Sequence, residues 1–324
     1  MPNIGSFNDP LRSKTVSSWN EDPAGGKRFY LLITPPIDAS ADTGYVKTGH
    51  VEAGLLMHRD GIYNSMTGGV PHHKEDTNVW SDISGNGNDM QLMVIEGGGT
   101  LDPDVSDRIH SRAIYFNGAG DYARNDTIKT SISALSPNQI TVEVCFREEP
   151  NPTTGSMLFE YAPEEPKALA GGWNIASGSF GLNLHNDGFN FTEGKAHTVV
   201  RTGNNYDISI PHRNFNIGVD MTKFTTISMV ISNVTDSTGR IVYINGSLVT
   251  AMSGGNGGST ATTYDSRGQI GSFPLSLAIR LAQIGLSGQV FFKGEIASLR
   301  IYDHKLSVAE IQHNYEEDLF RFGG

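Results

Sequence analysis

The sequence is poor in cysteine, in charge and in clusters of basic residues. Cys145 is the one cysteine among 324 residues, so no disulfide framework can form within a single chain. Charged residues make up only 18%, the net charge is −11, and no run of Lys or Arg occurs, which argues against a nucleic-acid ligand. No apolar stretch approaches the length of a membrane span. We therefore expect neither a nucleic-acid nor a membrane partner, and we expect Cys145 to be a buried small hydrophobe.

The sequence also lacks the motifs of common catalytic sites. It has no Gly-x-Ser-x-Gly elbow, no His-Glu-x-x-His and no phosphate-binding loop. Glycosidases need two carboxyl groups on one face, but the same-face neighbours of Glu143 in its strand are Thr141, Cys145 and Arg147. Glu160 likewise stands alone in its strand. These absences predict a protein that is not an enzyme.

Long helical periodicity is missing as well, and the pattern is that of an all-β protein. The 38 glycines suit many strands joined by tight turns. Apolar and polar residues alternate over 141–146 and 227–232, as in strands with one buried face. Asn245-Gly246 separates two short strand patterns and predicts a tight hairpin turn, because both turn residues need positive φ.

The C-terminal stretch is the most informative. In the strand that ends at Tyr302, we expect Ala297, Leu299 and Ile301 to face one side and the intervening residues to face the other. A helix of a turn or two then begins after Ser307, where Ser307 and Glu310 can form a capping box. Leu306 and Ile311 flank this box as a hydrophobic staple.

Three segments carry a resemblance to a known family. They are Trp80 to Asp89 (WSDISGNGND), Ala113 to Tyr122 (AIYFNGAGDY), and the C-terminal strand with its capped helix. In order and spacing they resemble the LamG-like, concanavalin A-like jelly-roll domains. The resemblance implies an all-β jelly-roll sandwich with one short C-terminal helix, and a role in binding glycans or proteins.

The proline-punctuated segment 1–44 lacks these motifs, so we predict two parts in the chain. Residues 1–44 are expected to be an extended N-terminal arm that anchors the protein, or else an edge strand of the sandwich. Residues 45–324 are expected to form the sandwich. Within it, residues 150–220 are rich in Asn, Gly and His and are predicted to be long loops and irregular strands.

A glycan site in such a domain needs aromatic platforms and short polar groups. Trp80 belongs to the resembling segment and is expected in the core, whereas other aromatic residues lie among loop patterns. The candidate ligand-binding residues are Trp173, Tyr122, Tyr206, Asn183, His185, Asn186 and Asp187.

Calcium is the candidate cofactor. Asp121 follows the turn Gly118-Ala119-Gly120, and in domains similar to this one an acid at this position often helps to bind Ca²⁺ or ties the turn to a neighbouring strand. Asx side chains also cap their own turns, which is the alternative interpretation. Asp121 is therefore the candidate metal ligand.

The function expected from these observations is a non-enzymatic binding or structural module. The first residues have neither the basic nor the apolar region of a signal peptide. This favours assembly in a host cytoplasm as a bacteriophage virion surface protein, such as a head fibre, decoration protein or tail component, that binds host surface polysaccharide and other virion subunits, as a candidate homo-oligomer. The alternatives are an extracellular protein, a glycoside hydrolase or lyase of the same fold, and a purely structural decoration protein.

Overall fold

The chain divides into two compact units, residues 1–44 and 45–324. In the first unit, strand β1 (Asn20–Glu21) pairs in antiparallel fashion with β2 (Lys27–Arg28). The computed structural model describes residues 20–21, 27–28, 48–94, 109–110, 112–135, 139–150, 152, 155–162, 179–186, 191–200, 213–231, 240–254, 272–279 and 291–323.

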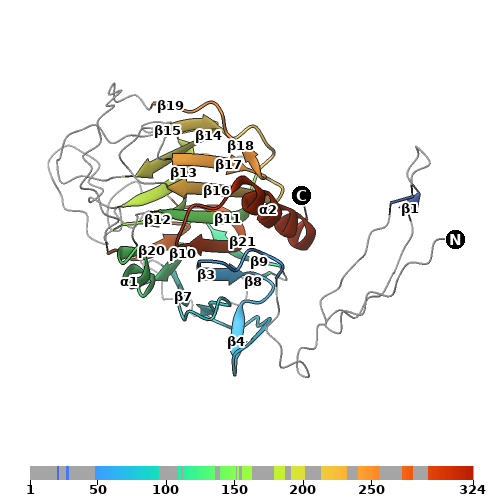
Figure 1. Cartoon of the computed structure of the whole chain (residues 1–324), viewed down its shortest axis with the longest axis vertical. Helices are drawn as coiled ribbons and strands as arrows, with labels where there is room; N and C mark the ends of the chain where they lie inside the picture. Colours follow the sequence, from blue (N-terminus) through green and yellow to red (C-terminus); the bar gives the residue numbers. More distant parts are fainter. Residues whose placement is uncertain are drawn as a thin grey trace. The chain divides into compact units, whose positions relative to one another are not determined.

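The second unit is an antiparallel β-sandwich of two large sheets, called here sheet 1 and sheet 2 (Figure 1). Sheet 1 has the strand order β19 (Ser253–Gly254), β15 (Arg213–Asn216), β14 (Phe191–Val200), β13 (Phe180–Asn186), β12 (Ser156–Tyr161), β20 (Leu275–Leu277), β10 (Asp121–Asn125), β7 (Met90–Val94) and β6 (Val79–Trp80). Sheet 2 has the strand order β18 (Ser247–Leu248), β17 (Arg240–Ile244), β16 (Thr225–Ile231), β11 (Ile140–Glu148), β21 (Lys293–Tyr302), β9 (Ala113–Asn117) and β8 (Ile109–His110). Strand β3 (Leu55–Asp60) also pairs with β21, and β4 (Ser65–Thr67) pairs with β5 (Val70–His72).

Two helices occur in the described residues. The short α1 (Ile128–Ser133), which the sequence pattern does not predict, inserts Ile128 and Ile132 into the core between the sheets. The C-terminal α2 (Val308–Phe322) lies across the strands of sheet 2 (Figure 1). No helix in the described part of the chain is long and apolar enough to cross a membrane.

The strands with a clear alternating pattern fold as predicted. Val142, Val144 and Phe146 of β11 point into the core between the sheets, and so do Ile227, Met229 and Ile231 of β16. Trp80 is fully buried in the same core, as expected, and Cys145 is a buried free thiol. Asn245 and Gly246 have φ values of 50° and 73°, which confirms the predicted two-residue hairpin turn.

One residue of β21 faces the opposite side from the one predicted. Leu299 and Ile301 face the core, but Ala297 packs on the outer side of sheet 2 against Cys145 and Phe322. The cause is an irregularity in the register between β11 and β21 at Cys145, which adds one residue to β21 and interrupts the alternation.

The range 150–220, for which long loops and irregular strands were predicted, contains four strands of sheet 1, and β12 and β13 have irregularities in their register. Strands β12, β13, β14 and β15 lie in this range and pair in sequence order in sheet 1. Their signal is weak because many of their outward residues are Asn, Gly and His, which are depleted in strands as a class.

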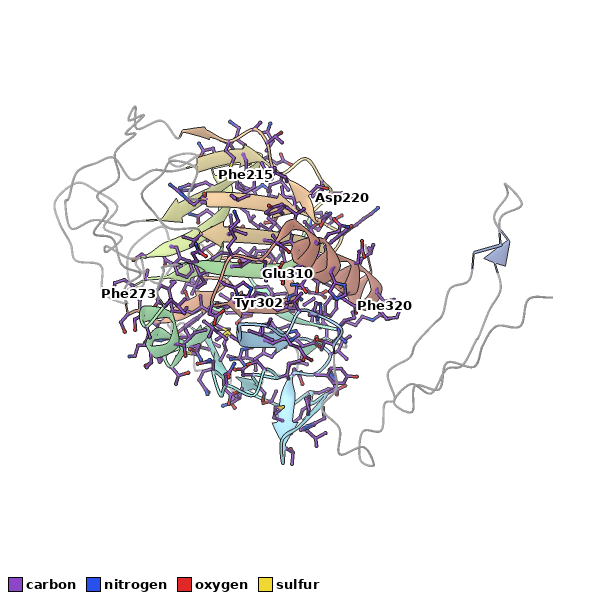
Figure 2. All side chains as sticks on the ribbon, viewed as in Figure 1. Phe215, Asp220, Phe273, Tyr302, Glu310 and Phe320 are labelled. Carbon is purple, nitrogen blue, oxygen red and sulfur yellow. The ribbon has the colours of Figure 1, made fainter. Side chains whose placement is uncertain are left out.

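The C-terminal helix begins as predicted and is longer than predicted. The backbone N–H of Glu310 donates to Ser307 Oγ at 3.3 Å, and the backbone N–H of Ser307 donates to Glu310 Oε2 at 2.8 Å. Leu306 and Ile311 are fully buried in one hydrophobic cluster with Tyr302, which confirms the staple. Tyr302 and the cap residue Glu310 are labelled in Figure 2. The helix continues for 15 residues. Its length was not predicted because two of its four buried residues, Asn314 and Asp318, are polar and weaken the apolar periodicity.

Candidate functional site

The two outer faces of the sandwich are different, because α2 occupies that of sheet 2. A cluster of buried polar side chains lies between this helix and the strands. Arg300 donates from Nη2 to Asp318 Oδ2 at 2.6 Å and from Nε to Glu143 Oε2 at 3.0 Å. Asn314 of α2 donates to the same Glu143 oxygen at 2.7 Å, and His50 Nε2 lies 2.9 Å from Asp318 Oδ1. We call these five residues the helix-docking cluster, and its contacts join α2 to the sheet.

Burial and the Arg300 charge shift the pKa values in this cluster. Burial raises the pKa of Glu143, although Arg300 opposes the rise. Burial alone would also raise the pKa of Asp318, but Arg300 and the hydrogen bond with His50 outweigh it and hold that pKa well below its usual range. Burial and Arg300 together lower the pKa of His50 to about 4. At neutral pH the cluster therefore holds a neutral histidine and an arginine–carboxylate pair.

The lowered pKa of His50 predicts that mild acid destabilises the protein. In the unfolded chain His50 takes up a proton near pH 6.5, whereas in the folded chain it resists protonation down to about pH 4. The unfolded state thus binds more protons in this window, and stability falls by roughly 1.4 kcal/mol per pH unit below pH 6.5. His58, whose pKa burial also lowers, acts in the same direction.

The measurement is the free energy of unfolding in urea at pH 7 and pH 5. Between these values His50→Gln should reduce the loss of stability by about 2 kcal/mol relative to wild type. His73 is exposed, so His73→Gln serves as the control and should lose as much as wild type. An equal loss in His50→Gln and wild type would contradict the prediction.

The Trp80–Asp89 segment is a structural loop in this protein. Asp82 Oδ1 accepts hydrogen bonds from the backbone N–H of His58 at 2.9 Å and of Ser84 at 3.0 Å. Asp82 Oδ2 accepts from the N–H of Asn88 at 2.9 Å, and Asp89 accepts from the N–H of Asp82 at 2.7 Å. The polar side chains therefore hold the loop against β3.

Asp121, the candidate calcium ligand, supports a turn. It is 2% exposed, and its Oδ2 accepts the backbone N–H of Asn117 at 3.1 Å. Asn117 Oδ1 in turn accepts the N–H of Ala119 at 2.7 Å. Within the described ranges, no three His, Cys, Asp or Glu side chains come together in a way that could hold a metal ion. Calcium binding at Asp121 stays a prediction, with oxygen ligands from turns as its chemical basis.

The outer face of sheet 1 carries a row of polar side chains. Leu182, Leu184, Ala196 and Phe215 of β13, β14 and β15 face the core, so the residues between them face outward. The register places three of these outward residues side by side on neighbouring strands, and the row is Asn183, His197 and Asn214.

A second outward row crosses the neighbouring strands. The register pairs Gln91 with Arg124, Arg124 with Ser276, and Ser276 with Glu160. Tyr122 lies near the β7 end of this row, where it packs with Ile279 and Phe291. We call these two rows and Tyr122 the polar face of sheet 1.

This face is open at one end and buried at the other. Gln91 and its neighbour Met93 are exposed at the β7 end. Glu160, Asn183 and His197 are each 2% exposed. Asn183 Nδ2 is buried and has no hydrogen-bond partner, which is unusual for an amide donor because an unmade buried hydrogen bond costs roughly 1–3 kcal/mol. The geometry therefore offers polar groups for a ligand that supplies an acceptor.

Only two of the seven predicted ligand-binding residues lie on the polar face of sheet 1. Asn183 and Tyr122 lie on the polar face. His185 has a φ of 52° at an irregularity of β13 and bonds through Nε2 to Glu148 Oε2 at 2.5 Å, while its Nδ1 accepts from the N–H of Gly194. Asn186 ends β13, and its side chain is not among those described. Trp173, Tyr206 and Asp187 lie outside the described residues.

Sequence reasoning missed His197, Asn214, Arg124 and Ser276, and it considered Glu160 only as an isolated acid. The sequence did contain a signal for two of them. Apolar Ala196 precedes His197 and apolar Phe215 follows Asn214, which is the alternation expected of strands with one outward polar face. That signal becomes readable only once β14 and β15 are recognised as strands.

Comparisons with known proteins support the fold. No family model matches the sequence, and no curated protein sequence matches it. Among solved structures, Trypanosoma rangeli sialidase in complex with 2,3-difluoro-KDN has a TM-score of 0.52 at 13% identity, over 94% of this chain and 37% of the sialidase. Another T. rangeli sialidase structure has a TM-score of 0.50 at 13% identity, over 82% of this chain and 33% of the other. The binding domain of botulinum neurotoxin DC reaches 0.46 at 10% identity, over 81% and 51% of the two chains.

At these identities the likeness shows the fold alone. The chain spans about a third of the length of the sialidases it matches. The predicted all-β sandwich is confirmed, while membership of the LamG-like family stays a prediction.

One expectation is overturned by the same comparison. The sequence predicted a protein that is not an enzyme, and that prediction is wrong, because the structures that share this fold include sialidases. Missing motifs in a sandwich sequence do not exclude enzymatic activity, since a fold hosts many functions.

Proposed function

We propose that the protein binds glycans on the polar face of sheet 1. The observation that carries the proposal is the amide of Asn183, whose Nδ2 donor is buried without a partner on an outward face. A sugar hydroxyl is both a donor and an acceptor, so it can satisfy this group while it donates to a neighbouring acceptor.

The surroundings of Asn183 suit a sugar better than an apolar ligand. The neighbouring outward side chains His197 and Asn214 are polar, and Ser276 and Glu160 follow in the next row. Tyr122 adds an aromatic ring near the open end, and binding sites commonly combine apolar rings with a few placed polar groups. The opposite outer face is occupied by α2, so sheet 1 is the face with polar groups to offer.

The test is binding of the whole chain to a panel of immobilised polysaccharides, followed by Asn183→Ala. The variant should lose at least tenfold in affinity for the glycan that wild type binds. Its melting temperature should not fall through lost hydrogen bonding, because Nδ2 makes no hydrogen bond in the free protein. Gln312→Ala, which removes a half-buried amide from α2, is the control and should bind as wild type does.

Two results would contradict the proposal. One is a wild type that binds no glycan of the panel. The other is an Asn183→Ala variant that binds equally well. Release of reducing ends is measured on the same panel, so that hydrolysis of a bound glycan is detected.

The proposed setting is the surface of a bacteriophage particle, where the chain acts as a head fibre, decoration protein or tail component beside other virion subunits. Its support comes from the sequence, in the resemblance to LamG-like domains. Mass spectrometry of purified virions tests it, and presence of the protein in cell fractions but never in particles would contradict it. Incorporation into particles without glycan binding would instead favour the purely structural decoration protein.

A further inference from the structure

A short segment before β3, residues 48–51, packs against α2 and is called here the strap. The backbone N–H of Val51 donates to Asn314 Oδ1 at 2.8 Å. Gly49 has a φ of 85°, and the carboxylate of Glu317 occupies the place that a side chain at position 49 would need. The strap and α2 therefore pack as one unit on sheet 2, on the side of the sandwich opposite the polar face of sheet 1.

Two histidine side chains are buried where the strap, α2 and β3 meet. His50 of the strap and His58 of β3 are 5% and 3% exposed, and their rings lie edge to face with centroids 5.2 Å apart. His50 Nε2 lies 2.9 Å from Asp318 Oδ1 of α2, whereas the buried Nε2 of His58 has no hydrogen-bond partner. In a protonated ring both nitrogens carry hydrogen, so a charged His58 would have a buried donor with no acceptor.

The charged groups around the two rings also oppose a further positive charge. Arg300 of β21 and Arg321 of α2 repel it, and Asp318 attracts it. Arg300 already donates to both Asp318 oxygens, at 2.7 and 2.6 Å, which neutralises that carboxylate. Burial, with a smaller effect of the two guanidiniums, lowers the pKa of both histidines, that of His50 to about 4.

Three further titratable groups lie around this site. Burial raises the pKa of Glu143 of β11, so Glu143 alone would favour the docked helix as the pH falls. Asp60 of β3 pairs with Arg321 of α2. His313 of α2 is exposed and donates to the carbonyl oxygen of Gly49 at 2.7 Å, which it can do in either charge state. Two histidines therefore act against one carboxyl group, and acid favours release of the helix.

We infer that α2 and the strap are released together in mild acid, while the sandwich beneath them stays folded. Release lets both histidines take up protons in water, and each one favours release by roughly tenfold per pH unit below pH 6.5. The apolar core between the two sheets contains no residue of α2, so local opening can leave it intact.

Acid would thereby uncover a face of sheet 2 that α2 covers at neutral pH. Val230, Tyr243 and Tyr302 pack there with Ile311 of α2, so the uncovered surface is apolar. The inference goes beyond the proposed glycan binding and does not depend on it, because the polar face belongs to the other sheet.

The experiment measures hydrogen exchange of the whole chain, peptide by peptide, by mass spectrometry at pH 7 and pH 5. After correction for the chemical exchange rate, peptides of α2 and of the strap should exchange at least roughly tenfold faster at pH 5. Peptides of β11 and β12 should stay protected over the same labelling time. ANS fluorescence should rise between the same pH values, because the released face is apolar.

Two variants connect the release to the histidines. His50→Gln removes one titrating ring and should make the gain in exchange between pH 7 and pH 5 roughly threefold smaller or more. His58→Phe keeps a ring of similar shape without the unpartnered nitrogen, should reduce the gain in the same way, and remains informative if His50→Gln fails to fold. His73→Gln, which removes an exposed histidine, is the control and should behave as wild type does.

Three results would overturn the inference. Loss of protection in β11 and β12 together with α2 at pH 5 would show that the whole unit unfolds. Equal exchange of α2 at pH 7 and pH 5 in wild type would show that the helix stays docked. An undiminished gain in both His50→Gln and His58→Phe would show that other groups cause the release.

Discussion

Replacing Arg300 with alanine is expected to destabilise the protein by about 3–5 kcal/mol at pH 7, because it breaks a buried ion pair from one side. Arg300 is fully buried and bonds to both Glu143 and Asp318 in the helix-docking cluster. Without the guanidinium, two buried carboxyl groups face each other with no counter-charge. Urea denaturation at 25 °C measures the difference from wild type.

The pH dependence of the stability lost in Arg300→Ala tests whether unpaired carboxylates cause the loss. Unpaired buried carboxylates can take up protons, so the destabilisation by Arg300→Ala should be smaller at pH 5 than at pH 7. Lys293→Ala is the control, because Lys293 forms an exposed pair with Glu149 and such pairs contribute roughly 0–1 kcal/mol. A loss of less than 1 kcal/mol in Arg300→Ala would mean that α2 does not depend on this cluster.

The second large effect is expected at the start of α2. Ile311 is fully buried and packs with Leu306, Tyr302 and Tyr243, so Ile311→Ala should cost about 2–5 kcal/mol through lost contacts and a cavity. Thermal and urea unfolding should both report the change.

Two neighbours provide graded comparisons for Ile311→Ala. Val308 is 61% exposed one helical turn earlier, and Val308→Ala should change stability by less than about 0.5 kcal/mol. Ser307→Ala removes the N-cap acceptor and should cost about 1 kcal/mol. If the three variants melted together, α2 would not be docked on sheet 2.

A cap, a turn or an alternating strand depends on neighbours in the sequence, and the sequence predicted those features correctly. The Ser307–Glu310 capping box needs only four consecutive residues, and the Asn245–Gly246 turn needs two. The alternation can be recognised because Val142, Val144 and Phe146 in β11 and Ile227, Met229 and Ile231 in β16 are apolar. The Trp80–Asp89 segment was recognisable because its loop is held mainly by hydrogen bonds between its own residues, so its sequence pattern is local. That pattern carried the resemblance from which the sandwich was predicted.

The features that the sequence could not show depend on contacts between distant segments. The helix-docking cluster gathers residues as far apart as His50 and Asp318, and nothing local indicates that Arg300 would be buried beneath a helix. Likewise, one irregularity in the pairing of β11 with β21 reverses Ala297.

The polar face of sheet 1 was decided in the same way. Asn183, His197 and Asn214 come from three strands, and only the register brings them side by side. In a sandwich both sheets have an inward and an outward side, and local alternation cannot tell which outward side a helix will cover. By itself the sequence determined an all-β sandwich with a capped terminal helix. The tertiary structure decided that the outward amide of Asn183 is left without a hydrogen-bond partner, because that depends on which distant side chains come within hydrogen-bonding distance of it.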